Sequence, residues 1–204
     1  MSYRIFLPFR SFLPSCYVVF SRPWSNYHSF SSDALSSLTL AKDDVVKIHV
    51  GAHIDGFASV SAETLVVGAS EENPVTGPRA NALKAAWTAA EVAQRLIKAG
   101  EKNWTVTDAV SKVAAAFGTK PIEGMSFFLS VQIYSLTDSL TGRSLLGMLS
   151  CEQSRNVIDG KKRIILNPTE GSRTGVDSAT FAEGDVWGLD ILITSGSDGK
   201  VRVT

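Results

Sequence analysis

Residues 44–57 read Asp44-Val45-Val46-Lys47-Ile48-His49-Val50-Gly51-Ala52-His53-Ile54-Asp55-Gly56-Phe57. β-branched and apolar side chains recur before the Asp55-Gly56 pair, and similar residues continue after it through residues 57–67. Asp-Gly is a preferred two-residue loop of a β-hairpin, because its residues tolerate the positive φ that the loop requires. The stretch therefore predicts a hairpin whose strands lie on either side of Asp55-Gly56.

Two helices and two short strands are predicted after the hairpin. An alanine-rich stretch over residues 81–98 repeats apolar side chains at helical spacing, and Gly100 is expected to end that helix. A second helix is expected to begin after Thr105 as its N-cap and to end at Gly118. Strands are predicted at residues 163–166 and 186–193. A hairpin followed by a helix pair and further strands indicates an α+β fold.

The composition is that of one globular domain. With 204 residues, of which 44% are hydrophobic and 20% charged, the chain is long enough for one sizeable core. Twenty basic and twenty acidic residues give a net charge of zero, so no field of the whole molecule attracts nucleic acid or an anionic membrane. Cys16 and Cys151 form no CxxC pair, which argues against a structural zinc site and a disulfide-stapled fold. No apolar run of about 18 residues predicts a transmembrane helix.

The first part of the chain differs from the rest. We divide the sequence into residues 1–32, which are predicted to be disordered, and residues 33–204, which are predicted to fold. No acidic residue precedes Asp33, whereas arginines and serines are frequent. This composition is typical of a mitochondrial targeting peptide. Prolines in the same segment would break the amphipathic helix of such a peptide, and the alternative is sequence foreign to the fold.

Residues 126–148 have the features of an insertion. Gly-Met occurs at residues 124–125 and again at residues 147–148, and the segment between them has neither a strand nor a helix period. A long excursion of this kind is unusual inside a compact domain. One hypothesis is that the segment is translated intron sequence, which transcript sequencing would test.

Two histidines and one aspartate are candidates for metal chemistry. His49 and His53 have the i, i+4 spacing that places two imidazoles on one metal when they lie on a helix. In a strand four residues span about 13 Å, so we do not expect them to share a metal. Asp190 lies alone in the apolar run of residues 186–193. It is either buried against a cation or hydrogen-bond donors, or it faces water on an edge strand.

Other recognisable sites are few. Lys161-Lys162-Arg163 is a compact basic triplet that either contacts phosphate or forms a solvated face. The chain contains no GxSxG nucleophile elbow, no complete P-loop and no GxGxxG fingerprint, so a catalytic serine and a nucleotide site are not expected.

Several ordered motifs carry a more specific signal. Together the motifs resemble those of the proliferation-associated protein and fungal curved DNA-binding protein family, over residues 32–125 and 149–204. The resemblance implies the pita-bread fold of methionine aminopeptidases, present here in part. The motifs are residues 43–57, Pro121-Ile122-Glu123-Gly124-Met125, Val157-Ile158-Asp159-Gly160 and Ile165-Leu166-Asn167-Pro168.

The resemblance also places the metal-ligand positions of the active aminopeptidases on this chain. The two aspartates of the first hairpin fall on His49 and Val60, and the histidine falls on Met125, or on Met148 if the insertion is placed earlier. The first glutamate falls on Asp190, and the second would lie beyond Thr204. One carboxylate, an imidazole, a valine and a thioether cannot hold two divalent ions. The resemblance therefore implies a non-catalytic protein with no catalytic residues, no metal and no cofactor.

The family resemblance implies a binding role. The expected partners are nucleic acid or a ribonucleoprotein, with protein partners also possible and no membrane, in a role in transcription, ribosome biogenesis or growth regulation. The expected location is cytoplasm and nucleus, with the mitochondrion as the alternative. The alternative function is a metal-dependent hydrolase of the methionine aminopeptidase type. Three departures weaken nucleic-acid binding: a replaced N-terminal portion, the extra residues 126–148, and the absence of the family's C-terminal half with its basic tail.

Overall fold

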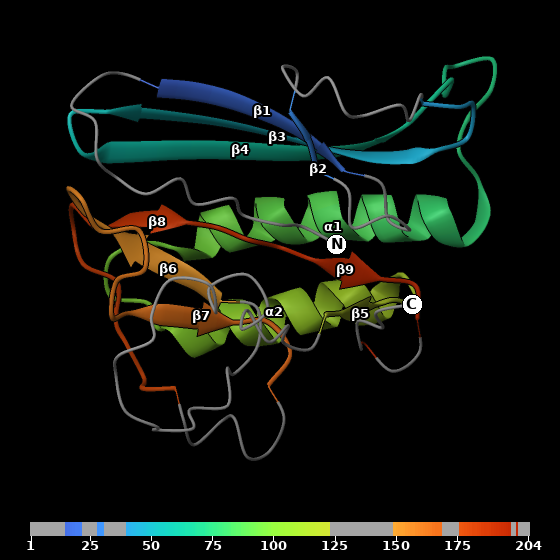
Figure 1. Ribbon diagram of the computed structural model, residues 1–204. Coiled ribbons are helices and arrows are strands. Elements are labelled where there is room, and N and C mark those ends of the chain that lie inside the picture. The colour runs from blue at the N-terminus through green and yellow to red at the C-terminus, as the bar shows by residue number, and fades with distance from the viewer. Residues whose placement is uncertain are drawn as a thin grey trace, which may run out of the picture.

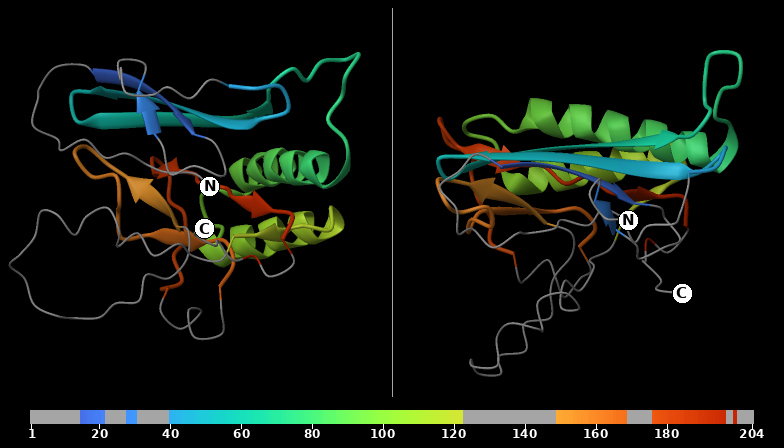
Figure 2. Two further views of the ribbon diagram at one scale, coloured as in Figure 1. Left: turned by 45° about the vertical axis from the view of Figure 1, so that its right-hand side comes forward. Right: turned by 45° about the horizontal axis from the view of Figure 1, so that its top comes forward.

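The computed structural model describes residues 15–21, 28–30, 40–122, 149–168, 176–196 and 199. Two helices lie side by side and form one layer, and the strands form the other (Figures 1 and 2). The predicted insertion at residues 126–148 lies outside the described residues. The combination of helices with antiparallel strands confirms the predicted α+β class.

The predicted hairpin is confirmed. Strand β3 (Val45–Ile54) pairs with β4 (Phe57–Val66) along its whole length, from Val45 opposite Val66 to Ile54 opposite Phe57. Asp55 has a φ of 51° and Gly56 a φ of 86°, which is the left-handed geometry of a two-residue type I′ loop.

The hairpin loop is fixed to the second half of the molecule. Arg155 donates from Nη2 to Oδ1 of Asp55 at 2.6 Å and from Nε to its carbonyl oxygen at 3.0 Å. The Asn156 amide donates to the Gly56 carbonyl at 2.7 Å. A Cβ at position 56 would lie 2.6 Å from Oδ1 of Asn156, so glycine is needed for this close approach as well as for its φ.

Two strands occur in the segment that the sequence predicts to be disordered. Strand β1 (Ser15–Ser21) pairs antiparallel with β3, and the short β2 (His28–Phe30) pairs with β1. The resulting sheet has the order β2-β1-β3-β4. Sequence reasoning misses β1 because its partner strand is distant in the chain, and strand pairing depends on that context.

Helix α1 (Gly77–Leu96) begins four residues before its predicted start. Pro78 lies in its first turn, where a missing N–H costs nothing, so the proline begins the helix and does not exclude it. The C-cap is Ile97, and Gly100 therefore lies beyond the end of the helix. The buried face is made of alanines that allow close packing against the next helix, α2 (Asn103–Ala116), namely Ala85, Ala89 and Ala93.

Helix α2 (Asn103–Ala116) begins earlier than predicted. The N-cap is Lys102, and the expected cap Thr105 lies inside the first turn. Asn103 is buried and binds the strands around it, and this tertiary role decides where the helix begins. The predicted end is confirmed, because Phe117 is the C-cap and Gly118 follows it with a φ of 65°.

The remaining strands form two small sheets. One has the order β7-β6-β8, from β6 (Leu149–Gln153), β7 (Arg163–Ile165) and β8 (Val186–Gly188), and the other pairs β5 (Lys120–Pro121) with β9 (Ile193–Thr194). The strand predicted at residues 163–166 is confirmed. The strand predicted at residues 186–193 is wrong as one element, because its two ends pair with different sheets and the chain between them leaves strand geometry.

The hydrophobic core lies between the helices and the strands of the second half. Strand β7 and its following residue contribute three fully buried side chains, Ile164, Ile165 and Leu166. Phe181 contacts the ring of Trp187 edge to face at 5.0 Å between centroids. The core therefore holds the segment after β8 in place. Its buried members are Ala89, Ala93, Val106, Val110, Ile164, Leu166 and Phe181.

Candidate functional site

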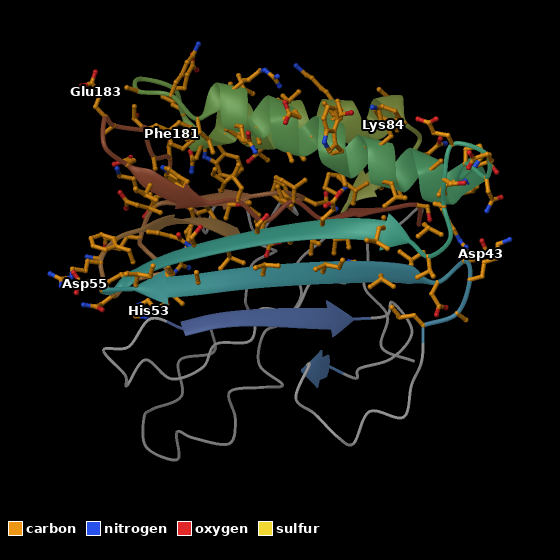
Figure 3. The ribbon with its side chains drawn as sticks, turned by 90° about the horizontal axis from the view of Figure 1, so that it is seen from above. Asp43, His53, Asp55, Lys84, Phe181 and Glu183 are labelled. Atoms are coloured by element: carbon orange, nitrogen blue, oxygen red, sulfur yellow. The ribbon has the colours of Figure 1, made fainter. Side chains whose placement is uncertain are left out.

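The candidate site lies on one face of the hairpin, where the sequence places the degenerate metal-ligand positions. Lys47 and His53 are separated by an even number of residues on β3, so they share a face of the sheet, and position 49 lies between them on the same strand. On β4, Val60 pairs with Gly51 and shares that face. Val60 is 47% exposed and offers no ligand atom. Figure 3 shows His53 at the loop end of the hairpin.

Asp190 lies between β8 and β9, in the chain that crosses from one small sheet to the other. Its backbone N–H donates to Oγ of the buried Ser150 at 2.8 Å, which holds the segment against β6. The side chain is half-buried, and its negative charge acts on Lys47. Asp190 therefore lies outside an edge strand and is half-buried, a position between the two alternatives left open by the sequence.

Lys47 is the residue of this site that sequence reasoning missed. Burial lowers the pKa of Lys47 to about 8. The Asp190 carboxylate acts in the opposite direction, because its negative charge raises the pKa of the ammonium. The alternation of β3 could have found it, because a lysine two residues from His49 must lie on the same face. Its electrostatic interaction with Asp190 could not be found in this way, because the two residues are far apart in sequence.

This donor set does not fit a dinuclear metal centre. Val60 has no donor atom, and the ammonium of Lys47 supplies a positive charge where a ligand shell would need negative ones. Within the described residues no cluster of three histidine, cysteine, aspartate or glutamate side chains could hold a metal ion. Met125 lies outside the described residues. His49 lies on β3 as expected, and its strand geometry keeps the i, i+4 spacing to His53 too long for one ion.

The buried lysine leads to a pH prediction. Lys47 has a pKa of about 8 when folded and an ordinary value of 10.5 when exposed, so between these values the unfolded chain binds a proton that the folded chain does not. The free energy of unfolding therefore rises with pH in this window, by about 2 kcal/mol from about pH 7 to about pH 9.5. Below pH 8 both states are protonated, and the burial penalty is present in full.

Urea unfolding at several pH values measures this effect. The variant Lys47→Met should lack the rise, and the exposed-site control Lys42→Met should keep it. Equal slopes in wild type and Lys47→Met would contradict the assignment.

The basic triplet is divided by the structure. Lys162 lies 2.7 Å from Oδ2 of Asp185 and 3.1 Å from Oε1 of Glu152. The hydrogen bond from Lys162 lowers the pKa of the Asp185 carboxyl, and the two acidic partners raise the pKa of Lys162. Lys161 and Arg163 are exposed. Only these two outer residues of the triplet are therefore available to an external anion.

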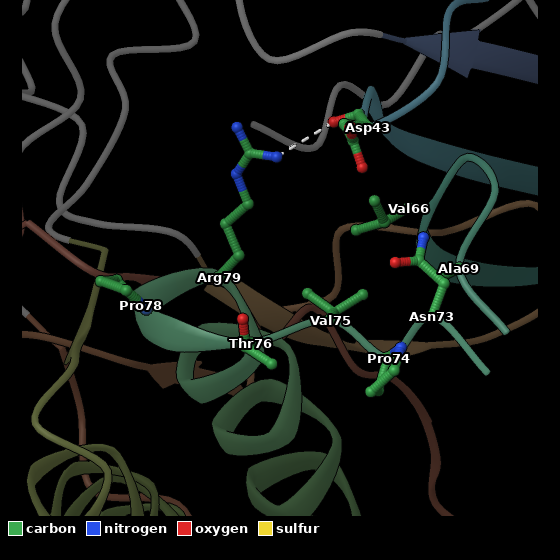
Figure 4. A pocket seen from close by; sticks show the side chains of 9 residues that line it. All are labelled: Asp43, Val66, Ala69, Asn73, Pro74, Val75, Thr76, Pro78 and Arg79. Carbon is green, nitrogen blue, oxygen red and sulfur yellow. Dashed lines mark hydrogen bonds between the residues drawn. The ribbon is translucent and has the colours of Figure 1, made fainter. Parts of the chain in front are cut away.

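A separate open pocket of about 350 Å³ lies between the end of β4 and the start of α1 (Figure 4). Arg79 crosses it and donates from Nη1 to the Asp43 carbonyl at 3.1 Å. None of the degenerate ligand positions lines it, so the pocket and the candidate site are different places. Its lining residues are Asp43, Val66, Ala69, Asn73, Pro74, Val75, Thr76, Pro78 and Arg79.

No helix in the part of the chain that the structure describes combines the length and the apolar character that crossing a bilayer requires.

Comparison with known proteins agrees with the motifs and the fold. The model of metallopeptidase family M24 matches residues 11–162. The curved DNA-binding protein of Schizosaccharomyces pombe is 46% identical over 84% of this chain and 38% of its own length. ERBB-3 binding protein 1 of Solanum tuberosum is 38% identical over 85% of this chain and 38% of its own. The chain thus spans little more than a third of the length of these relatives.

A solved structure is also similar. The structure of a thermophilic Arx1 superimposes with a TM-score of 0.63 and 22% identity, over 96% of this chain and 52% of that one. That level of identity speaks for the fold alone. The matched family model and the shared fold together show that this chain belongs to metallopeptidase family M24, has its pita-bread fold, and resembles the curved DNA-binding and proliferation-associated proteins.

Proposed function

We propose that this chain is a non-catalytic member of the M24 fold that acts as a binding factor for nucleic acid or a ribonucleoprotein. The observation that carries the first half is Val60, which has no donor atom at a ligand position on the face of the hairpin that also holds Lys47, whose charge attracts the Asp190 carboxylate. A cation beside the site opposes the binding of a divalent ion, and one carboxylate with a valine cannot complete a dinuclear ligand set. Without such an ion the fold lacks the activated water that hydrolysis in this superfamily needs.

The second half of the proposal is supported by the name of the Schizosaccharomyces pombe relative, a curved DNA-binding protein. The charge of this chain gives modest support, because the net charge is zero and Lys162 is engaged by two carboxylates. Lys161 and Arg163 are the exposed cations of the triplet and are our candidates for phosphate contacts. A location in cytoplasm and nucleus is part of the same proposal.

A titration of curved DNA and of structured RNA at several salt concentrations tests the binding role. We expect binding whose logarithm falls linearly with the logarithm of salt, because each phosphate contact releases about 0.9 of a counterion from a duplex. In the double variant Lys161→Gln/Arg163→Gln the slope should decrease by about 2. Lys84→Gln on the exposed face of α1 is the control and should leave the slope unchanged.

Absence of salt-dependent binding to either nucleic acid would contradict the proposal and favour a protein partner.

The alternative function, a metal-dependent hydrolase of the methionine aminopeptidase type, is tested separately. Elemental analysis of the purified chain measures manganese, cobalt, iron and zinc. A dinuclear site requires two equivalents of metal and hydrolysis of a methionyl peptide that chelators abolish. We expect less than one equivalent and no such hydrolysis. Two equivalents with chelator-sensitive activity would overturn the non-catalytic half of the proposal.

A further inference from the structure

The loop end of the β3–β4 hairpin exposes an aromatic ring. Phe57, the first residue of β4, is 59% exposed, and Ile54, which pairs with it across the hairpin, is 61% exposed. Val157, on the turn that bonds the hairpin loop, is 40% exposed. Charged side chains surround these apolar ones, because Asp55 and Arg155 are exposed as well. Exposed apolar side chains inside a polar rim mark a binding surface.

The ring has a fixed place. The two-residue loop sets where β4 begins, and the Arg155 guanidinium bonds both the side chain and the carbonyl of Asp55. The Cζ atom of Arg155 lies 6.0 Å from the centroid of the Phe57 ring. Because the loop and the guanidinium hold each other in place, little conformational entropy is lost when a ligand binds at this ring.

Basic residues gather at the same end of the molecule, where the hairpin loop lies beside the connection from β6 to β7 (Figures 1 and 2). Residues 154–163 contain four basic residues and one acidic residue, in a chain whose net charge is zero. Lys162 is engaged by two carboxylates, and the other three basic residues are exposed. Of the five N–H donors of Arg155, the bonds to Asp55 that the structure describes use two, so others can bond a phosphate.

We propose that Phe57 stacks on an unpaired base of single-stranded nucleic acid while Arg155 binds the neighbouring phosphate. This inference rests on the proposed function and names its ligand class and the place where a base binds. The bases of a duplex stack on each other, whereas a single strand or a loop can place a base on a protein ring. Phe57 offers a π face to the base, and Arg155 offers a planar set of donors to the phosphate. Lys161 and Arg163, the phosphate contacts already proposed, follow on the same connection.

A second exposed ring lacks these neighbours. Trp87 on α1 is 60% exposed, and Nζ of Lys84 lies only 4.6 Å from the ring centroid, so an ammonium covers one face closely. One turn further along the helix Arg95 is paired with the Glu91 carboxylate at 2.8 Å. An arginine fork beside the ring, which matches phosphate, is not among the described contacts of Trp87. This ring is therefore a matched control and not a second base site.

Three probes test the stacking role: an unstructured oligoadenylate, an abasic oligonucleotide of the same length, and a duplex of that length. Phe57→Leu removes the ring and keeps an apolar side chain, so the hairpin should remain folded. We expect this variant to bind the oligoadenylate about tenfold more weakly and the other two probes like the wild type. Phe57→Tyr keeps a ring and should bind all three like the wild type. The salt dependence of Phe57→Leu should not change, because no charge is removed.

Two further variants complete the test. Trp87→Leu removes an equally exposed ring beside a cation and should leave all three affinities unchanged. Arg155→Gln should reduce the salt slope for the oligoadenylate by about 0.7, the value of one phosphate contact on a single strand. An unchanged slope would overturn the phosphate contact.

The outcomes separate this inference from the proposed function. If Phe57→Leu weakened all three probes equally, or did not weaken the oligoadenylate, the stacking role would be overturned while nucleic-acid binding remained. A wild-type chain that bound none of the probes would overturn both.

Discussion

Replacing Asn103 with alanine is expected to lower the free energy of unfolding by roughly 3–5 kcal/mol. Asn103 is 1% exposed. Its Nδ2 donates to the Arg163 carbonyl at 2.8 Å and to the Asp177 carbonyl at 3.0 Å. Its Oδ1 accepts from the amides of Trp104 at 3.0 Å and Ala179 at 3.1 Å. Alanine would leave these groups without their partner in a place where water does not reach easily.

The size of this effect follows from what Asn103 joins. One amide connects the first turn of α2, the start of β7 and the segment of residues 177–179, and no other side chain described in the structure bonds all three. A buried polar group that loses its partner costs about 1–3 kcal/mol. In Asn103→Ala several backbone N–H and C=O groups would lose their partner at once. Thr107, one turn later, adds a bond to the Ile165 carbonyl at 2.7 Å but cannot replace the lost ones.

Urea unfolding with a two-state fit measures the loss. Asn73→Ala is the matched control, because Asn73 also makes a side-chain bond, to the Gly68 carbonyl at 3.2 Å, but lies exposed. We expect the control to lose less than about 1 kcal/mol. If Asn103→Ala also lost less than about 1 kcal/mol, the hydrogen bonds of Asn103 would contribute little to the free energy of unfolding.

The comparison of sequence and structure separates local signals from distant ones. The hairpin was predictable because Asp55-Gly56 demands a positive φ whatever surrounds it. The start of α2 was not, because Asn103 takes its role from residues 163 and 177–179, which lie far along the chain. Thr105 is a good cap by its type alone, and the tertiary bonds of Asn103 override that preference.

The same distinction applies to the candidate site. The degenerate positions His49, Val60 and Asp190 follow from motifs, and the strand positions of the first two follow from the period of a strand. Lys47 was overlooked because a lysine in an amphipathic strand usually faces water. Its burial is a tertiary effect that the strand pattern does not reveal. The apolar run of residues 186–193 likewise gave no sign that it breaks between β8 and β9.

Replacing Phe181 with alanine is expected to cost about 3–5 kcal/mol and to loosen the candidate site. The ring is 2% exposed and packs edge to face on Trp187 of β8. The Phe181 backbone should remain in place, because its N–H donates to the Glu101 carbonyl at 2.9 Å and its carbonyl accepts from the Gly100 amide at 3.0 Å. The core would therefore keep a cavity that cannot easily collapse, which is the condition for a large loss.

The loss should extend from the core to Lys47. Trp187 precedes Asp190 by three residues, so a looser β8 weakens the position of the carboxylate and admits water to the buried ammonium. In Phe181→Ala the pKa of Lys47 should move back toward its ordinary value, and the rise in stability between about pH 7 and about pH 9.5 should shrink.

Trp87→Ala removes a larger ring that is 60% exposed on α1. This control should cost less than about 1 kcal/mol and should leave the pH dependence unchanged. A Phe181→Ala chain that is destabilised yet keeps the full pH dependence would show that the core does not position Asp190.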